Sequence, residues 1–129
     1  MKSFKILYVE DYPVVQAMYL DVLKKHNFAV DAVNDGKEAL QKAAKNEYDV
    51  VLLDLLLPQV SGVEFLREFR KTHPDTEVIV LSDFDYPETV KEIASLGVKH
   101  YWIKVDNTPH VMAEKLQEVL NKQQKPAKP

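Results

Sequence analysis

The chain has 129 residues and a mass of 14.8 kDa, which is about the length of a single domain. Hydrophobic residues make up 46% of it and charged residues 29%, a balance that excludes a wholly disordered or collagen-like chain. Its 17 Lys and Arg residues against 20 Asp and Glu residues give a net charge of −3. This balance argues against direct nucleic-acid binding, because binding to phosphates needs a basic face.

Cysteine is absent, so disulfides, thiolate nucleophiles and cysteine-ligated zinc are excluded. The longest apolar run, Val50 to Leu57, is interrupted by Asp54 and is far shorter than the ~18 residues of a membrane span. The N-terminal residues reach Glu10 and Asp11 without the apolar block of a signal peptide. We therefore expect a cytoplasmic domain with no membrane contact.

Five short apolar runs, separated by stretches with helical spacing, predict alternating strands and helices. The runs are rich in Val, Ile, Leu and aromatic residues and are mostly continuous, which is typical of parallel strands covered on both faces. They lie at Phe4–Val9, Phe28–Val33, Val50–Leu53, Val78–Leu81 and Tyr101–Ile103. Apolar stripes in the intervening stretches are typical of helices that pack on a sheet. The pattern predicts an α/β fold with right-handed crossovers and helices on both faces of the sheet.

Helix start and stop signals agree with this order. Capping-box spacing occurs in Asp35 with Glu38, Ser61 with Glu64, and Asp85 with Glu88. Prolines suited to a first helical turn are Pro13, Pro87 and Pro109, and Gly97 marks the expected end of the fourth helix. The polar residues 123–129 predict a flexible tail or the beginning of a linker, which leaves residues 3–122 as the folded domain.

Chemically useful side chains follow four of the five predicted strands. They are Glu10 and Asp11 after the first, Asp54 after the third, Ser82 after the fourth and Lys104 after the fifth. Ligands of open α/β sheets bind outside the carboxyl ends of the strands. Asp11 alone could merely cap a helix and Asp54 alone could form a turn, but the placement of all of them at successive strand ends favours a site.

The three acids would repel one another if the first and third strands are neighbours. Two like charges ~4 Å apart repel by about 4 kcal/mol at an effective dielectric of 20, so three pairs reach on the order of 10 kcal/mol. That is comparable to the whole stability of a small domain, and Lys104 alone does not offset it. A divalent cation would offset this repulsion. An oxygen-only ligand set without Cys or a local His favours Mg²⁺ over zinc.

Taken together, these motifs resemble the receiver domain of two-component response regulators over roughly residues 3–122. The motifs are the Glu10-Asp11 pair, Asp54 followed by Pro58 and Gly62, Ser82 after an apolar strand, Lys104 three residues beyond Tyr101, and the stretch 34–40. The resemblance implies a flavodoxin-like, doubly wound sheet of five parallel strands in the order 2-1-3-4-5. It also implies that Asp54 accepts a phosphoryl group from a sensor histidine kinase or a phosphotransfer protein in a Mg²⁺-dependent reaction.

The resemblance also assigns ligands to the Mg²⁺ ion. Asp11 and Asp54 would bind it directly, Glu10 would help through water, and the backbone carbonyl of Leu56 would add an oxygen. Lys104 would pair with a phosphoryl oxygen.

A switch is implied as well. Ser82 would donate a hydrogen bond to the phosphoryl group, and Tyr101 would move into the vacated space. This changes the face formed by the fourth helix, fifth strand and fifth helix, where we also expect contacts through Val90 and Ile93. The expected partners are a downstream protein target or an output domain of a longer chain, and a phosphorylation-dependent homodimer is a further expectation.

Some residues depart from the family pattern. Val105 stands where a proline usually follows the lysine, and Asp83 stands where a small residue is typical. These two departures leave open the alternative that the chain is a degenerate receiver, which acts as a phosphate-independent interaction module. Leu56 and Phe84 flank the approach of hydrolytic water, so we expect slow self-dephosphorylation.

Two other classes fit less well. A phosphatase with an aspartate nucleophile usually carries Asp-x-Asp after the first strand, whereas this chain has Glu10-Asp11. A flavin carrier would need a Ser-, Thr- or Gly-rich phosphate loop at the same place, where the acidic pair has the opposite charge. We expect a signalling domain that catalyses only its own phosphorylation and dephosphorylation, not an enzyme acting on an external metabolite.

Overall fold

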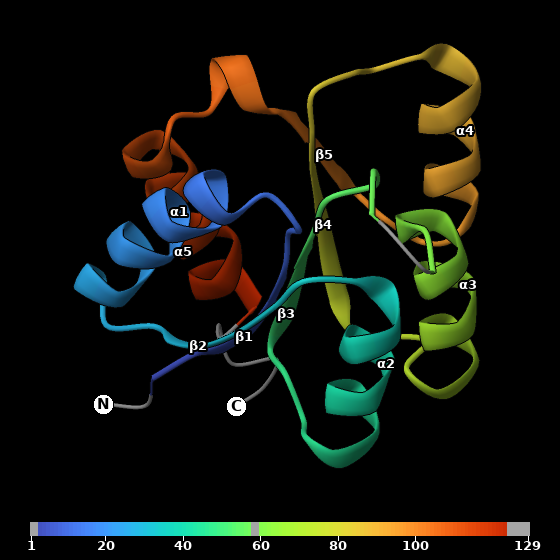
Figure 1. The fold of residues 1–129 in the computed structure, drawn as a ribbon, viewed down its shortest axis with the longest axis horizontal. Coiled ribbons are helices and arrows are strands. Elements are labelled where there is room, and N and C mark those ends of the chain that lie inside the picture. The colour runs from blue at the N-terminus through green and yellow to red at the C-terminus, as the bar shows by residue number, and fades with distance from the viewer. Residues whose placement is uncertain (1–2, 58–59, 124–129) are drawn as a thin grey trace.

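The computed structural model describes residues 3–57 and 60–123, which form a five-stranded parallel sheet between two layers of helices (Figure 1). In chain order the elements are β1 (Lys5–Val9), α1 (Pro13–Lys25), β2 (Ala29–Val33), α2 (Gly36–Lys45), β3 (Val50–Leu53), α3 (Gly62–Thr72), β4 (Glu77–Ser82), α4 (Pro87–Ser95), β5 (His100–Ile103), the 3-10 turn η1 (Lys104–Asp106) and α5 (Pro109–Gln123). The strand order is β2-β1-β3-β4-β5, which confirms the predicted fold.

The register of the central strands brings their carboxyl ends to one edge. Val9 of β1 lies beside Val33 of β2 and Leu53 of β3. The pairing continues past the strands, because the Glu10 amide donates to the Val33 carbonyl (3.1 Å) and the Asp54 amide donates to the Val9 carbonyl (3.0 Å). The residues that follow β1 and β3 therefore emerge next to each other.

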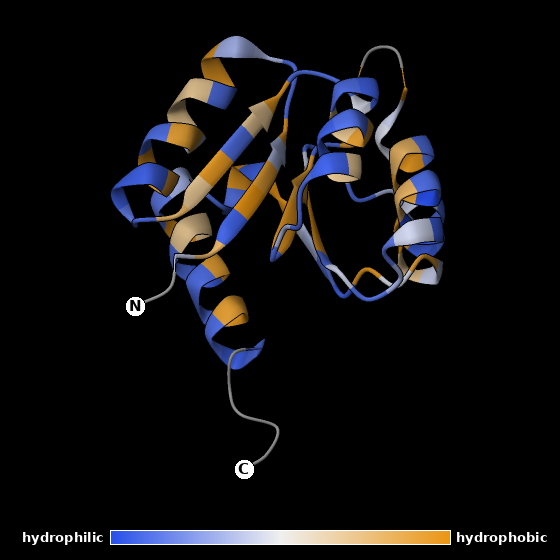
Figure 2. Ribbon diagram, turned by 90° about the horizontal axis from the view of Figure 1, so that it is seen from below, coloured by the Kyte–Doolittle hydropathy of each residue, from blue (hydrophilic) through white to orange (hydrophobic). Residues whose placement is uncertain are grey.

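Each face of the sheet has its own hydrophobic core. α1 and α5 cover one face, where Tyr8, Tyr19 and Leu116 are buried, and α2, α3 and α4 cover the other (Figure 1). Coloured by hydropathy, β1, β3 and β4 form an apolar layer between these helices (Figure 2). Ile93 of α4 is only 1% exposed and belongs to the second core. The prediction that Ile93 offers a partner contact is therefore wrong, because its side chain faces the sheet.

The helix starts follow the predicted signals in part. Ser61 and Glu64 form a complete capping box at α3. Asp35 caps α2 by accepting from the Glu38 amide (2.7 Å). The Asp85 cap is wrong: Pro87 takes the first turn of α4, so the residue before it, Tyr86, is the N-cap and makes no side-chain cap bond.

The end of α4 is held by Gly97 and Arg70. Gly97 follows the helix with φ +82°, a conformation that glycine adopts without steric cost. The Arg70 guanidinium of α3 donates to the carbonyls of Leu96 (2.7 Å) and Gly97 (3.4 Å). It also donates to the carbonyls of His73 (3.0 Å) and Thr76 (2.6 Å), so one side chain joins the ends of α3 and α4.

The predicted domain limits differ slightly from the helix ends. α5 includes Gln123, one residue beyond the predicted end of the domain. The rest of the predicted tail, residues 124–129, and Pro58 lie outside the described residues. Within the described part of the chain, no helix has the length and apolarity needed to cross a membrane.

Candidate functional site

Three carboxylates meet where β1 and β3 end. Glu10, Asp11 and Asp54 each place an oxygen within 4.8 Å of the others. Glu10 is 1% exposed and Asp54 is 7% exposed, whereas Asp11 lies at the surface. The predicted convergence of the acids is confirmed. The alternative that Asp11 merely caps a helix is wrong, because α1 has Tyr12 as its N-cap and no side-chain cap bond.

Lys104 crosses from the end of β5 to join two of these acids. Its Nζ lies 2.8 Å from Glu10 Oε1 and 3.2 Å from Asp54 Oδ2. Burial acts to lower the pKa of Lys104, but the hydrogen bond to Glu10 and the charge of Asp54 outweigh it and raise the pKa. Burial raises the pKa of the Glu10 carboxyl, the Lys104 ammonium opposes this, and the negative charge of Asp54 adds to it. One ammonium thus serves two buried carboxylates.

Backbone amides hold the remaining carboxylate oxygens in place. The Tyr12 amide donates to Glu10 Oε2 (3.2 Å), and the Leu56 amide donates to Asp54 Oδ1 (3.1 Å). On the sheet side of α1, Gln16 Nε2 donates to the carbonyls of Glu10 (2.8 Å) and Val33 (3.1 Å). Gln16 thereby ties the ends of β1 and β2 to α1, and it fixes the backbone that carries the acidic pair.

Gly62 allows the chain after β3 to fold back onto Asp54. A Cβ at Gly62 would lie 2.6 Å from Leu55 Cα and 2.7 Å from the Asp54 carbonyl oxygen, distances that backbone atoms do not accommodate. Its amide donates to the Leu55 carbonyl (3.1 Å). The glycine in the sequence motif is therefore required by close approach to the backbone that presents Asp54.

Ser82 and Tyr101 lie on either side of the loop that follows β4. Ser82 is 3% exposed, and its Oγ accepts from the Phe84 amide (3.2 Å). The Tyr101 hydroxyl donates to the Phe84 carbonyl (2.7 Å), and burial raises its pKa, although a hydrogen bond with the Ser82 side chain acts to lower it. Both predicted switch residues thus contact the same residue of this loop.

The residues that depart from the family pattern all have exposed side chains at the surface of the domain. Val105 is 83% exposed and Asp83 is also exposed, so neither fills the space around Asp54. Leu56 is 60% exposed and Phe84 is 44% exposed, which leaves apolar surface beside the site. The structure thus places Leu56 next to Asp54 through its amide, and the predicted role of its carbonyl as a metal ligand stays a prediction.

The charges of the site fit a hard divalent cation. Three carboxylates face one ammonium, so the cluster carries a net negative charge, and its donors are all oxygen atoms. Oxygen ligands with excess negative charge are what Mg²⁺ prefers in proteins. Zinc, by contrast, is usually held by Cys or His, and neither belongs to the cluster.

A tyrosine hydroxyl lies buried close to these charges. Tyr8 of β1 is 1% exposed, and its hydroxyl has no hydrogen-bond partner among the described residues. Burial raises its pKa, and the negative charge of Glu10 adds to this, so the hydroxyl stays neutral. Its ring packs near that of Tyr19, with centroids 6.3 Å apart.

Two residues that support the site, Gln16 and Asn107, carry no pattern in the sequence that marks them as functional. Gln16 gave no signal, because a polar residue on α1 looks like part of the solvent-facing surface. Asn107 is 4% exposed and bonds to Tyr19 of α1 and to Lys115 of α5. The Asn-Thr-Pro sequence before α5 contains Asn107, but it indicates only the start of a helix and not a role in supporting the site.

Comparison with protein families matches the response regulator receiver domain over residues 6–117. The chain belongs to this family. As a receiver domain it is a component of two-component signalling, and receiver domains generally bind Mg²⁺ at an acidic cluster of the kind formed by Glu10, Asp11 and Asp54.

Similar proteins agree with the assignment. Response regulator ArlR of Staphylococcus saprophyticus is 34% identical over 111 residues, which cover 84% of this chain and 49% of ArlR. Chemotaxis protein CheY of Thermotoga maritima is 28% identical over 120 residues, which cover 92% of this chain and 95% of CheY. This receiver domain spans about half the length of the first curated relatives it matches.

A solved structure shows the same fold. The CheY-like receiver domain protein from Methanospirillum hungatei JF-1 matches with a TM-score of 0.89 at 24% identity, over 96% of this chain and 98% of that one.

Proposed function

We propose that this receiver domain accepts a phosphoryl group on Asp54 from a sensor histidine kinase or a phosphotransfer protein. The observation that carries the proposal is the contact of the Lys104 ammonium with both Asp54 and Glu10, inside a cluster of three carboxylates. A merely structural Asp54 would not need two further acids beside it, because they raise the free energy of the folded state.

The transfer forms an acyl phosphate. A carboxylate oxygen of Asp54 attacks the phosphorus, the P–N bond to the donor imidazole breaks, and the imidazole leaves with the bonding electron pair and takes up a proton. Asp54 Oδ1 is held by the Leu56 amide and Oδ2 contacts Lys104, so the carboxylate is already oriented. Orientation of this kind supplies most of the catalysis in phosphoryl transfer, because the protein has little covalent chemistry to perform.

Lys104 would stabilise the charge that accumulates on the phosphoryl oxygens. The raised pKa of Lys104 keeps its ammonium protonated near neutral pH, and Nζ is already within reach of the reacting carboxylate. Glu10, Asp11 and Asp54 would hold Mg²⁺, with the Leu56 carbonyl as a further expected ligand. When bound, Mg²⁺ would neutralise the repulsion between the carboxylates and the phosphoryl oxygens.

The switch would begin at Ser82. Its hydroxyl would donate to a phosphoryl oxygen on Asp54, and its Oγ already accepts from the Phe84 amide. Movement of Ser82 would therefore displace the loop whose Phe84 carbonyl holds the Tyr101 hydroxyl. A space of about 470 Å³ beside Tyr101, lined also by Pro87, Val90 and Ile103, gives the ring room to change position.

A phosphate-independent interaction module is the competing proposal. Asp83 and Val105, the two residues that favoured it, are exposed, and the Lys104 ammonium pairs with Glu10 and Asp54. The partners we propose are a cytoplasmic kinase or phosphotransfer protein and a downstream protein or linked output domain. We also propose that phosphorylation promotes a homodimer through the α4-β5-α5 face. The domain would catalyse only its own phosphorylation and dephosphorylation.

Incorporation of phosphoryl from a small donor such as acetyl phosphate tests the proposal. We expect Mg²⁺-dependent labelling of the wild type and none of Asp54→Asn. Asp83→Asn is the matched control, since it removes an exposed carboxyl at the end of a neighbouring strand and should remain labelled. Absence of labelling in the wild type, or labelling that persists in Asp54→Asn, would exclude the proposed role of Asp54.

A further inference from the structure

The loop that carries Lys104 is held by a buried asparagine. Lys104 begins the 3-10 turn η1, and the next side chain, Val105, is 83% exposed and so adds little packing. Asn107, directly after the turn, is 4% exposed. A buried amide side chain is costly unless its polar atoms find partners, so its contacts decide its role.

Asn107 bonds to the backbone on both sides of the Lys104 peptide unit. The main-chain N–H of Asn107 donates to the Lys104 carbonyl (3.0 Å), and its side-chain Nδ2 donates to the Ile103 carbonyl (2.8 Å). It is not the cap of α5, because the Met112 amide donates to the Thr108 carbonyl and the helix begins after that residue. The side chain instead turns back onto the strand end from which Lys104 projects.

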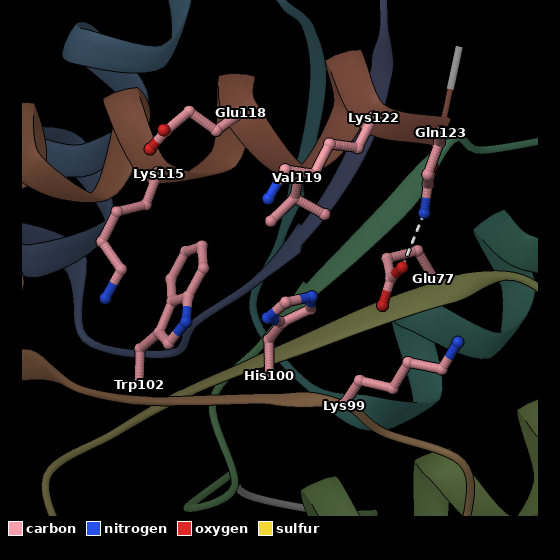
Figure 3. A pocket seen from close by; sticks show the side chains of 9 residues that line it. All are labelled: Glu77, Lys99, His100, Trp102, Lys115, Glu118, Val119, Lys122 and Gln123. Carbon is pink, nitrogen blue, oxygen red and sulfur yellow. Dashed lines mark hydrogen bonds between the residues drawn. The ribbon is translucent and has the colours of Figure 1, made fainter. Parts of the chain in front are cut away.

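Two helices on the same face of the sheet fix Asn107 in turn. The buried Tyr19 hydroxyl of α1 donates to the main-chain carbonyl of Asn107 (2.8 Å), and Lys115 Nζ of α5 donates to the side-chain Oδ1 of Asn107 (2.7 Å). The ammonium of Lys115 lies 4.5 Å from the centre of the Trp102 ring, and Figure 3 shows it beside the indole. Trp102 is 8% exposed, so this contact holds Lys115 against β5.

We infer that Asn107 is a positioning residue that places the Lys104 ammonium between Glu10 and Asp54. This inference rests on the proposed function, in which Lys104 meets the phosphoryl group. Lys104 has a long flexible side chain, so the position of Nζ depends on where its backbone is held. A misplacement of 1 Å costs up to about 100-fold in rate for well-oriented reactions. Tyr19 and Lys115 act through Asn107 and are not expected to touch the phosphoryl group.

A double-mutant cycle distinguishes positioning from a merely structural role. The rate of phosphorylation by acetyl phosphate is measured for the wild type, Asn107→Ala, Lys104→Ala and the double variant, at equal folded concentration. We expect Asn107→Ala to lower the rate on the order of 10- to 100-fold in the wild-type background. In the Lys104→Ala background the same change should have little effect, because the residue through which Asn107 acts is gone.

Tyr48→Phe is the matched control. It removes a side-chain hydrogen bond of similar length, from the Tyr48 hydroxyl to Asp31 (2.6 Å), on the opposite edge of the sheet. Its rate should equal that of the wild type. Equal losses from Asn107→Ala in both backgrounds, or an unchanged rate in the wild-type background, would overturn the inference.

A readout without any phosphoryl donor separates this inference from the proposed function. The NMR signals of the Lys104 ε-methylene report its pairing with Glu10 and Asp54 in the unmodified protein. We expect Asn107→Ala to move them towards those of exposed lysines, and Tyr48→Phe to leave them in place. Unchanged signals in Asn107→Ala overturn the inference, whereas shifted signals in a protein that takes no label overturn only the proposed function.

Discussion

Replacement of Asp11 by asparagine is expected to stabilise the metal-free protein. Asp11 has an oxygen within 4.8 Å of oxygens of both Glu10 and Asp54, and Lys104 contacts only the other two acids. A pair of charges at that distance repels by about 3.5 kcal/mol at a dielectric of 20 and by about 0.9 kcal/mol in bulk water. Because Asp11 is exposed, the lower value applies better, and two pairs give a gain of about 1–2 kcal/mol.

The same substitution should remove most of the stabilisation by Mg²⁺. A ligand that binds only the folded state adds about 2.7 kcal/mol at a concentration of 100 Kd. Urea unfolding followed by circular dichroism, in EDTA and in MgCl₂, measures both effects. The wild type should gain stability from Mg²⁺, and Asp11→Asn should start higher and gain little.

Asp21→Asn serves as the control, because Asp21 is an exposed acid of α1 that pairs with Lys25 (3.0 Å). It should lose no more than about 0.5 kcal/mol and leave the response to Mg²⁺ unchanged. A loss of stability for Asp11→Asn in EDTA, or an undiminished Mg²⁺ effect, would show that repulsion among the acids does not govern this site.

Three further changes test other parts of the structure. Tyr8→Phe removes a buried hydroxyl that has no partner among the described residues. The free energy of unfolding in urea should therefore stay unchanged or rise by up to about 1 kcal/mol, and a decrease would reveal a hydrogen bond made by this hydroxyl. Burial and the hydrogen bond to Asp31 raise the pKa of Tyr48, so its contribution to stability is full below pH 10 and declines as the pH rises above it. Tyr48→Phe should therefore flatten the fall in stability between pH 10 and 11, and an unchanged slope would contradict the assignment. Leu56→Asn and Phe84→Gln should each speed loss of label from isolated phosphoprotein several-fold by admitting water, whereas rapid loss from the wild type would refute slow self-dephosphorylation.

The sequence predicts the sheet and the meeting of the acids because both follow from local pattern. Continuous apolar runs mark the buried strands, and parallel strands deliver the residues after them to one edge, so Glu10 and Asp54 had to meet once β1 and β3 paired. The failure at Asp85 is also local: Pro87 shifts the start of α4 by one residue and moves Glu88 out of capping position.

The remaining failures concern contacts between distant parts of the chain. Ile93 lies within the same helical stretch as Val90, and only the packed structure shows that α4 turns Ile93 into the core. Asn107 looks like any polar loop residue until Tyr19, 88 positions earlier, is seen to donate to it. Such contacts leave no periodic signal, so the support of Lys104 could be found only in three dimensions.

The Arg70 guanidinium has a mechanical consequence for α4. It anchors the carboxyl end of that helix through the Leu96 and Gly97 carbonyls, while Tyr86 at the amino end is 61% exposed. A shift of the preceding loop would therefore rotate α4 about its carboxyl end, which Arg70 holds in place. Amide exchange should accordingly be slower at Leu96, whose amide donates to the Ile93 carbonyl (3.0 Å), than at Val90, whose amide donates to the Tyr86 carbonyl (2.9 Å) at the amino end, and the reverse gradient would rule out the pivot.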